Sequence, residues 1–246
     1  MAQKLAGKVA VVTGASKGIG AGIALKLAAE GAALVVNYAS DKKGADRVVS
    51  EITGNGGKAI AVQANVAKPE DIRRLFAEAK KAFGRLDILV NNAGITSSGD
   101  GSPGAASLEA VRRTFDTNFF GTLAVTQAML PLLKRSASAR IVNLSSGLGS
   151  LAQIGDPNSE LSAFRFIGYG ASKAALNMLT VQLAAELKDS GIKVNSADPG
   201  YTATDLNQRR GRQTIPQGAA VAIRLALLPD DGPTGGFFAM SHPQPW

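Results

Sequence analysis

Residues 9–20 read VAVVTGASKGIG, in which four apolar residues run directly into a glycine-rich turn that opens a helical pattern. Glycines at such a turn permit a tight bend, close backbone approach to a pyrophosphate, and close packing of helix on strand. The N-terminus of the following helix offers free N–H groups and a positive dipole end to phosphates. This order of strand, turn and helix predicts a dinucleotide-binding βαβ unit.

The same alternation of short apolar runs and helical stretches continues along almost the whole chain. The predicted strands are Val9–Val12, Ala33–Asn37, Ala59–Gln63, Ile88–Val90, Arg140–Leu144, Lys193–Ala197 and Gly236–Ala239. The predicted helices are Ile19–Glu30, Lys42–Thr53, Pro69–Phe83, Ser107–Leu133, Gly170–Asp189 and Ile215–Leu228. No Pro/Ser-rich linker divides the chain. The pattern predicts an α/β fold: residues 1–246 form a single doubly wound, Rossmann-type domain with a seven-stranded, mostly parallel sheet flanked by helices.

Three segments lack a regular pattern: residues 96–106, 147–168 and 202–214. Each follows a predicted strand. Because ligands of open α/β sheets bind beyond the carboxyl ends of the strands, we expect these segments to surround one cleft.

Composition excludes several classes of protein. The chain has no cysteine and one histidine, so no disulfide framework, thiolate nucleophile or metal site is expected. No apolar run approaches the roughly 20 residues that cross a bilayer, and none suits a signal peptide, which favours a cytoplasmic protein. The net charge is +8, but the basic residues are scattered as pairs on predicted helices, which indicates solvated faces rather than a nucleic-acid surface.

The end of the second predicted strand bears on the choice of cofactor. Enzymes that use NAD commonly place an acid there to hold the ribose 2′-hydroxyl, whereas this chain has Asn37, Tyr38 and Ser40. Lys17 and Ser40 could donate hydrogen bonds to a 2′-phosphate, as could the nearby lysines of the second helix. NADPH is therefore favoured, while the alternative that Asn37 merely caps a strand and both cofactors bind stays open.

Four residues form a candidate catalytic set. Tyr169 and Lys173 are four positions apart (173 − 169) at the start of a predicted helix, so they share one face. An adjacent ammonium and a positive nicotinamide ring favour phenolate and lower a tyrosine pKa. Ser146 ends the fifth strand and could hydrogen-bond a carbonyl oxygen, whereas Ser145 would point to the other face. Asn118, within a long predicted helix, could hold a water that links Lys173 to solvent.

These motifs together resemble the short-chain dehydrogenase/reductase family. The matching elements are Thr13-Gly14-x-x-x-Gly18-x-Gly20, Asn91-Asn92-Ala93-Gly94, Asn118, Ser146, Tyr169-x-x-x-Lys173 and Pro199-Gly200, in the family's order. The resemblance implies that Tyr169 donates a proton in reduction and that Ser146 orients the carbonyl. It further implies that Lys173 lowers the tyrosine pKa and holds ribose, with Asn118 in a proton relay.

The resemblance also extends the expected cofactor contacts. Asn65 would contact adenine, Asn92 and Gly94 would border the cofactor, and Thr202 and Thr204 would flank the carboxamide and pyrophosphate. The full expected cofactor-binding set is Gly14, Ser16, Lys17, Gly18, Ile19, Gly20, Asn37, Tyr38, Ser40, Asn65, Val66, Asn92, Ala93, Gly94, Tyr169, Lys173, Pro199, Gly200, Thr202 and Thr204.

The two halves resemble different branches of the family. Residues 5–95 are similar to oxoacyl-carrier-protein and trihydroxynaphthalene reductases, and the chain from Ser97 onward is similar to bacterial relatives of carbonyl reductase. We interpret this as a possible chimera joined near Asn91–Gly94. The favoured function is NADPH-dependent reduction of a small ketone or aldehyde. The alternatives are 3-oxoacyl-carrier-protein reduction, with the basic residues 209–212 contacting an acidic carrier, and a non-catalytic NADP-binding regulator.

Ser146 and Tyr169 are 23 positions apart (169 − 146), a longer separation than is usual in this family. A similar insertion in monomeric carbonyl reductases packs where other members place a subunit interface. Residues 147–168 are therefore predicted to form a pocket wall that also modifies assembly, and surface decoration stays open as the alternative. The apolar residues expected to line the pocket are Leu148, Leu151, Phe164, Phe166 and Ile167. The choice between monomer and homo-oligomer is undecided.

Overall fold

Seven short strands form one sheet in the computed structural model, which describes residues 3–240 and 242–246. They are β1 Val9–Val12, β2 Ala33–Tyr38, β3 Ala59–Gln63, β4 Ile88–Asn91, β5 Arg140–Leu144, β6 Lys193–Ala197 and β7 Phe237–Phe238. The order is β3-β2-β1-β4-β5-β6-β7, and every neighbouring pair is parallel. The predicted fold class is confirmed, with a fully parallel sheet in place of a mostly parallel one.

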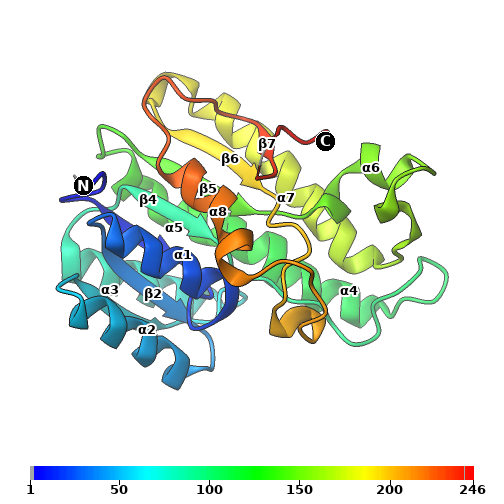
Figure 1. The fold of residues 1–246 in the computed structure, drawn as a ribbon, viewed down its shortest axis with the longest axis horizontal. Coiled ribbons are helices and arrows are strands. Elements are labelled where there is room, and N and C mark those ends of the chain that lie inside the picture. The colour runs from blue at the N-terminus through cyan, green and yellow to red at the C-terminus, as the bar shows by residue number, and fades with distance from the viewer. Residues whose placement is uncertain (1–2, 241) are drawn as a thin grey trace.

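Two layers of helices cover the sheet (Figure 1). On one face pack α1 Gly18–Ala29, α2 Lys42–Gly54 and α8 Ile215–Ala226. On the other pack α3 Pro69–Phe83, α5 Thr122–Leu133 and α7 Ile167–Glu186. Successive strand residues serve opposite layers: Val12 and Val36 pack toward the first, Val11 and Val35 toward the second. Burial on both faces explains the nearly continuous apolar strands.

The predicted helix Ser107–Leu133 is helical throughout but not continuous. It consists of α4 Leu108–Phe115, a π-helical turn at Asp116–Gly121, and α5. The π turn lies against the segment after β3, where a Cβ on Gly121 would be 2.7 Å from the Val66 carbonyl oxygen. π turns occur mostly as single-turn interruptions of α-helices and often at functional sites. Asn118 lies inside this turn.

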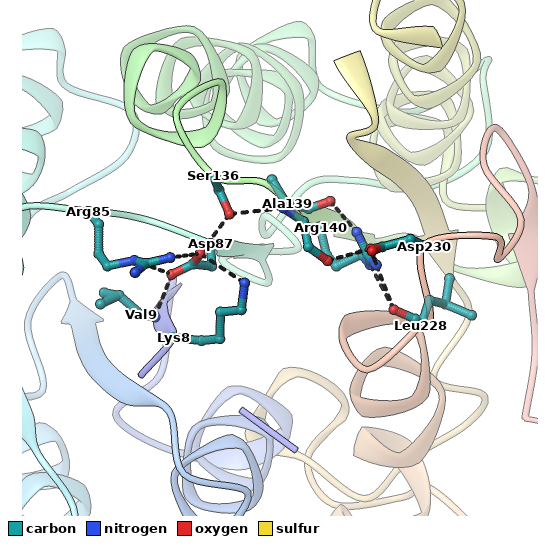
Figure 2. A network of polar contacts seen from close by, with 10 residues as sticks. Lys8, Val9, Arg85, Asp87, Ser136, Ala139, Arg140, Leu228 and Asp230 are labelled. Carbon is teal, nitrogen blue, oxygen red and sulfur yellow. Dashed lines mark hydrogen bonds and ion pairs between the residues drawn. The ribbon is translucent and has the colours of Figure 1, made fainter. Parts of the chain in front are cut away.

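A polar network joins the strands at their amino ends (Figure 2). The carboxylate of buried Asp87 accepts hydrogen bonds from the Val9 N–H at 2.9 Å, from Arg85 at 2.7 Å and from the Ser136 hydroxyl at 2.6 Å. Burial alone would raise the pKa of Asp87, but its hydrogen bonds hold it below its usual value. Arg140, also buried, donates to main-chain oxygens and to an exposed aspartate beyond α8. These contacts therefore hold the amino ends of β1, β4 and β5 together.

In the described part of the chain, no helix combines the length and apolar character needed to cross a membrane. Nor does any group of three or more histidine, aspartate and glutamate side chains there suit a metal ion.

Candidate active site

The glycine turn after β1 is shaped to receive a phosphate group. Gly14 and Gly18 have φ of 61° and 57°, the left-handed region that glycine adopts without strain. The Asn92 side chain donates to the main-chain oxygens of Thr13 at 2.8 Å and Gly14 at 3.0 Å. A Cβ on Gly20 would lie 2.4 Å from that amide nitrogen. Helix α1 has neither a side-chain cap nor an acid in its first turn, so its N–H groups suit the pyrophosphate of a dinucleotide.

Asn37 is one of the residues predicted to bind the cofactor. Its side chain is buried beneath the glycine turn. Its oxygen accepts from Gly14 N–H at 3.1 Å, and its nitrogen donates to the main-chain oxygen of Ala64 at 2.9 Å. The strand continues one residue further, to Tyr38, than the prediction. Asn37 therefore supports the turn from below, because its amide is already committed to main-chain groups.

The groups that could meet a 2′-phosphate are exposed at this edge. Ser40 is exposed, and so is Lys17, whose ammonium pairs with Asp205 at 2.8 Å. Asp205 belongs to a short 3₁₀ turn, Asp205–Asn207, within the segment 202–214. The Lys17 hydrogen bond lowers the pKa of Asp205. Thr204 lies beside the glycine turn, with its methyl 3.8 Å from the position of a Cβ on Gly18.

The remaining expected cofactor residues lie at the carboxyl ends of the strands. Ser16 and Val66 are buried, Asn65 is half-buried, and the Ala93 N–H donates to the Thr13 hydroxyl at 3.0 Å. Gly200 adopts φ 66°, and the Thr202 hydroxyl donates to the main-chain oxygen of Pro199 at 3.0 Å. The structure thus brings these segments to one sheet edge, although Thr202 is buried and turns its hydroxyl inward.

Tyr169, Lys173 and Ser146 meet at the start of α7. Ser146 hydrogen-bonds the Tyr169 hydroxyl, and the Lys173 ammonium lies 5.6 Å from the centre of the Tyr169 ring. Lys173 also donates to the main-chain oxygen of Leu144, the last residue of β5, at 2.6 Å. Ser145 is buried beneath, with its hydroxyl 3.4 Å from the Lys173 carbonyl oxygen. Of the two serines, Ser146 is the one beside the tyrosine.

Burial is the largest cause of the pKa shifts of Tyr169 and Lys173. It raises the pKa of Tyr169 to about 12, against the Ser146 hydrogen bond, which lowers it, and with Asp198, which adds to the rise. Burial lowers the pKa of Lys173 to about 8. The lowering of the tyrosine pKa by Lys173 together with a positive nicotinamide ring stays a prediction for the cofactor-bound site. At neutral pH Tyr169 keeps its proton, the state that a proton donor requires.

Asn118 is fully buried, and its side chain joins two segments of the site. The amide oxygen accepts from Ile95 N–H at 2.8 Å, and the amide nitrogen donates to the Ile95 oxygen and to the Ser172 hydroxyl, both at 3.0 Å. A Cβ on Gly94 would lie 3.5 Å from the Asn118 oxygen and 3.6 Å from the Lys173 nitrogen. The side chain thus fixes the segment after β4 against α7, while its part in a proton relay stays a prediction.

Three polar features of the site were missed from the sequence. Asn91, the last residue of β4, and Asn143, the last but one of β5, lie in register and hydrogen-bond each other at 2.9 Å, a pairing that their positions near the strand ends could have indicated. Asp198 accepts from the N–H groups of Gly200 and Gly147, and an aspartate just before Pro-Gly is a usable turn signal. Asp100 contacts the start of α7 from far away in the chain, for which no local signal exists.

The insertion between Ser146 and Tyr169 contains regular structure where none was expected. It holds 3₁₀ turns at Gly147–Gly149 and Glu160–Ala163 and a short helix, α6 Leu151–Gly155. The Leu148 N–H donates to the Ser146 hydroxyl at 3.2 Å, and the Leu161 side chain lies 2.6 Å from the position of a Cβ on Gly147, the next residue. Of the expected pocket residues, Leu151 is 75% exposed and Phe164 and Phe166 are about half exposed against each other. Figure 1 shows this insertion and α4 at the same end of the molecule.

Residues 242–246 return to the insertion and hold α6. The Ala152 N–H donates to the Trp246 oxygen at 3.0 Å, and the Ser150 hydroxyl donates to the Pro245 oxygen at 2.8 Å. The Trp246 ring stacks on Phe237 of β7 at 5.5 Å. The insertion is therefore tied to the last strand of the sheet.

The site combines a turn that suits a dinucleotide with a protonated tyrosine near a lysine, both at the carboxyl ends of the strands. These features define the site of an oxidoreductase. The family model described as short chain dehydrogenase matches residues 8–214, and the chain belongs to this family.

Known relatives agree with this membership. An uncharacterized oxidoreductase of Methylorubrum extorquens is 48% identical over 213 residues, which cover 85% of this chain and 78% of the relative. A 3-oxoacyl-[acyl-carrier-protein] reductase of Synechocystis is 41% identical over 87% of this chain and 81% of its own length. The crystal structure of a short chain dehydrogenase from Burkholderia cenocepacia in complex with NADP has a TM-score of 0.83 and 34% identity, over 96% of this chain and 97% of that one.

Proposed function

We propose that this protein reduces ketones or aldehydes to alcohols with NADPH, and that Tyr169 donates the proton. The observation that carries the proposal is the arrangement at the start of α7. The Tyr169 hydroxyl keeps its proton and hydrogen-bonds Ser146, and the Lys173 ammonium lies 5.6 Å from the centre of the Tyr169 ring. The glycine turn at the same edge suits a dinucleotide, and the Burkholderia neighbour is an NADP complex.

NADPH, when bound along the glycine turn, supplies a hydride to the carbonyl carbon. The hydroxyls of Ser146 and Tyr169 hydrogen-bond the carbonyl oxygen and stabilise the negative charge that develops there. Tyr169 then transfers its proton to that oxygen, which completes the alcohol and leaves a phenolate. The nearby Lys173 ammonium stabilises this phenolate. The products are the alcohol and NADP+.

The preference for NADPH over NADH rests on the exposed groups near the glycine turn. Lys17 pairs with Asp205, and Asp41, the residue after Ser40, accepts the Gly44 N–H as the N-cap of α2. Strand β2 itself ends in Tyr38 rather than a carboxylate. Lys17 and Ser40 would donate to the 2′-phosphate, while Lys173 would reach the nicotinamide ribose. We place this activity in the cytoplasm, in keeping with a chain without cysteine.

A second candidate is reduction of 3-oxoacyl groups on an acyl-carrier protein, as the name of the Synechocystis relative states for that protein. The exposed Arg209, Arg210 and Arg212 beside the cleft would contact an acidic carrier. The extended insertion favours reduction of small carbonyl compounds, because Leu161 brings an additional apolar side chain against Gly147, the residue after Ser146.

Oxidation of NADPH should be followed with aliphatic and aromatic ketones, aldehydes, and an acetoacetyl thioester on coenzyme A or on carrier protein. We expect turnover of free ketones and equal turnover of the two thioesters. A strong preference for the carrier-linked thioester, abolished by replacing the three arginines with alanine, would favour the second candidate. Tight NADPH binding without turnover of any carbonyl would contradict both enzyme readings.

A further inference from the structure

The catalytic helix α7 lacks a capping side chain of its own. Its N-cap residue, Phe166, makes no side-chain hydrogen bond, and its first turn contains no acid. The first N–H groups of a helix have no partner within the helix and must find one elsewhere. Here the third of these N–H groups belongs to Tyr169 itself.

Asp100 and Gly101, from the segment after β4, supply all of these partners. The Ile167 N–H donates to the Gly101 oxygen at 2.9 Å. The Gly168 N–H donates to one carboxylate oxygen of Asp100, and the Tyr169 N–H donates to the other, both at 2.8 Å. The first bond within the helix is then made by Gly170, to the Phe166 oxygen.

Gly168 allows this approach. A Cβ at that position would lie 3.1 to 3.2 Å from the carboxyl atoms of Asp100, closer than most side-chain contacts. Asp100 is half-buried, and its carboxylate faces the positive end of the helix dipole. Hydrogen bonds from N–H groups to a carboxylate are roughly twice as strong as those between neutral groups.

Asp100 also connects Tyr169 to the cofactor side of the site. The segment that carries it begins at Asn92–Gly94, beside the glycine turn, and its Ile95 is held at both main-chain atoms by Asn118. A displacement of this segment would therefore move the tyrosine relative to the nicotinamide position. We propose that Asp100 is a positioning residue that fixes the Tyr169 hydroxyl for proton transfer by capping α7 from a distant segment. This inference rests on the proposed role of Tyr169.

The test compares Asp100→Ala and Asp100→Asn with Leu183→Ala, a truncation of a buried residue near the other end of the same helix. Asp100→Ala should lower kcat by about tenfold or more, since small displacements of reacting groups are costly, with the NADPH dissociation constant within about twofold of the parent. Asp100→Asn keeps one acceptor oxygen, so its kcat should lie between those of the parent and Asp100→Ala. Leu183→Ala should lower the melting temperature with a far smaller change in kcat.

Hydrogen exchange of residues 166–172 gives a readout independent of turnover. The amides of Gly168 and Tyr169 should exchange faster in Asp100→Ala than in the parent. In Leu183→Ala they should exchange at the same rate as in the parent. Unchanged kcat or unchanged exchange in Asp100→Ala would overturn the inference, as would an equal loss of kcat in Leu183→Ala. Tyr169→Phe, measured alongside, separates the two proposals: if it retains turnover, the proposed function fails whatever Asp100 does.

Discussion

At the scale of single residues, the proposed chemistry depends on half-buried Tyr169 and buried Lys173. Burial raises the pKa of the Tyr169 hydroxyl to about 12 and lowers the pKa of the Lys173 ammonium to about 8. The tyrosine therefore holds its proton throughout the physiological range. The lysine carries its charge below about pH 8 and loses it above, so only one of the two groups changes state near neutrality.

This difference predicts a pH dependence for carbonyl reduction. The rate should be level below pH 7 and fall as the pH rises through about 8, because the neutral lysine no longer stabilises the phenolate that proton transfer leaves. The measurement is kcat at saturating NADPH and ketone across this range. A kcat that stays constant up to pH 10 would show that the Lys173 ammonium does not stabilise the phenolate.

The sequence predicted well which residues lie near one another at the site. It predicted less well which groups each of them contacts. Tyr169 and Lys173 share a helix face, and strand alternation separates Ser146 from Ser145, so these placements follow from local geometry. Asn37 is different, because its amide turns inward to Gly14 and Ala64, groups brought to it by the fold. The three partners of Asn118 likewise come from two other segments, and local sequence says nothing about them.

At the scale of elements, the insertion and the last residues of the chain act together. Helix α6 and its N-cap Ser150 donate hydrogen bonds to residues 244–246, and the Trp246 ring stacks on Phe237 of β7. Leu161 and Leu151 differ in their surroundings within the insertion. Leu161 lies against Gly147, the residue after Ser146, whereas Leu151 is 75% exposed.

These two leucines provide a matched pair for the expected pocket wall. Leu161→Ala should alter KM across a series of ketones of increasing size, because it removes apolar surface beside Ser146, and should leave the NADPH dissociation constant nearly unchanged. Leu151→Ala, with the same chemistry at an exposed site, should leave the ranking of ketones as it is. Steady-state kinetics on both variants check this, and identical substrate rankings in all three proteins would leave the insertion as surface decoration.

The segment 202–214 touches the glycine turn through the Lys17–Asp205 pair. The Asp205 carboxylate would compete with a 2′-phosphate for the same ammonium. Asp205→Asn should therefore tighten NADPH binding by up to about fivefold, the range of an exposed ion pair, without tightening NADH binding. Glu109→Gln, which breaks a similar exposed pair with Arg113 on α4, is the charge-matched control for the fluorescence titrations. Equal effects on both cofactors would show that Lys17 does not meet the 2′-phosphate.

Strands β1, β3, β5 and β6 begin and end as predicted. Three of them, β1, β5 and β6, lie inside the sheet, where burial on both faces favours apolar residues, whereas β3 forms one edge and of its residues only Val62 is buried. Helix α7 begins three residues earlier than predicted, since Asp100 supplies a cap from another segment. The short helices of the insertion were missed because they present no apolar periodicity long enough to detect.

At the scale of the whole molecule, the carboxyl ends and the amino ends of the parallel strands have separate roles. The glycine turn, the proposed catalytic residues and the three irregular segments gather at the carboxyl ends of the strands. The amino ends hold the Asp87 network, in which a buried carboxylate joins β1, β4 and the segment before β5 (Figure 2). Stability and chemistry can therefore be altered independently.

Asp87→Asn should lower the free energy of unfolding by about 3 kcal/mol, because it leaves buried donors without a charged partner. The lowered pKa of Asp87 means that its contribution is present at neutral pH and is lost as the pH falls through the folded-state value. The variant should therefore show a weaker loss of stability toward acid in urea denaturation, with its kcat preserved under conditions where it is folded. Asp46→Asn, which breaks an exposed pair with Lys42 on α2, should change stability little, and equal stability of Asp87→Asn and the parent would refute this account of the network.

The most direct test of the central claim is the comparison of Tyr169→Phe with the parent in ketone-dependent NADPH oxidation, alongside NADPH binding measured by fluorescence. The substitution removes the proton that the mechanism transfers and leaves the ring in place. We predict a loss of kcat of at least about a thousandfold, with the NADPH dissociation constant unchanged within about threefold. Retention of more than about a tenth of the parent kcat would contradict the claim that Tyr169 is the proton donor.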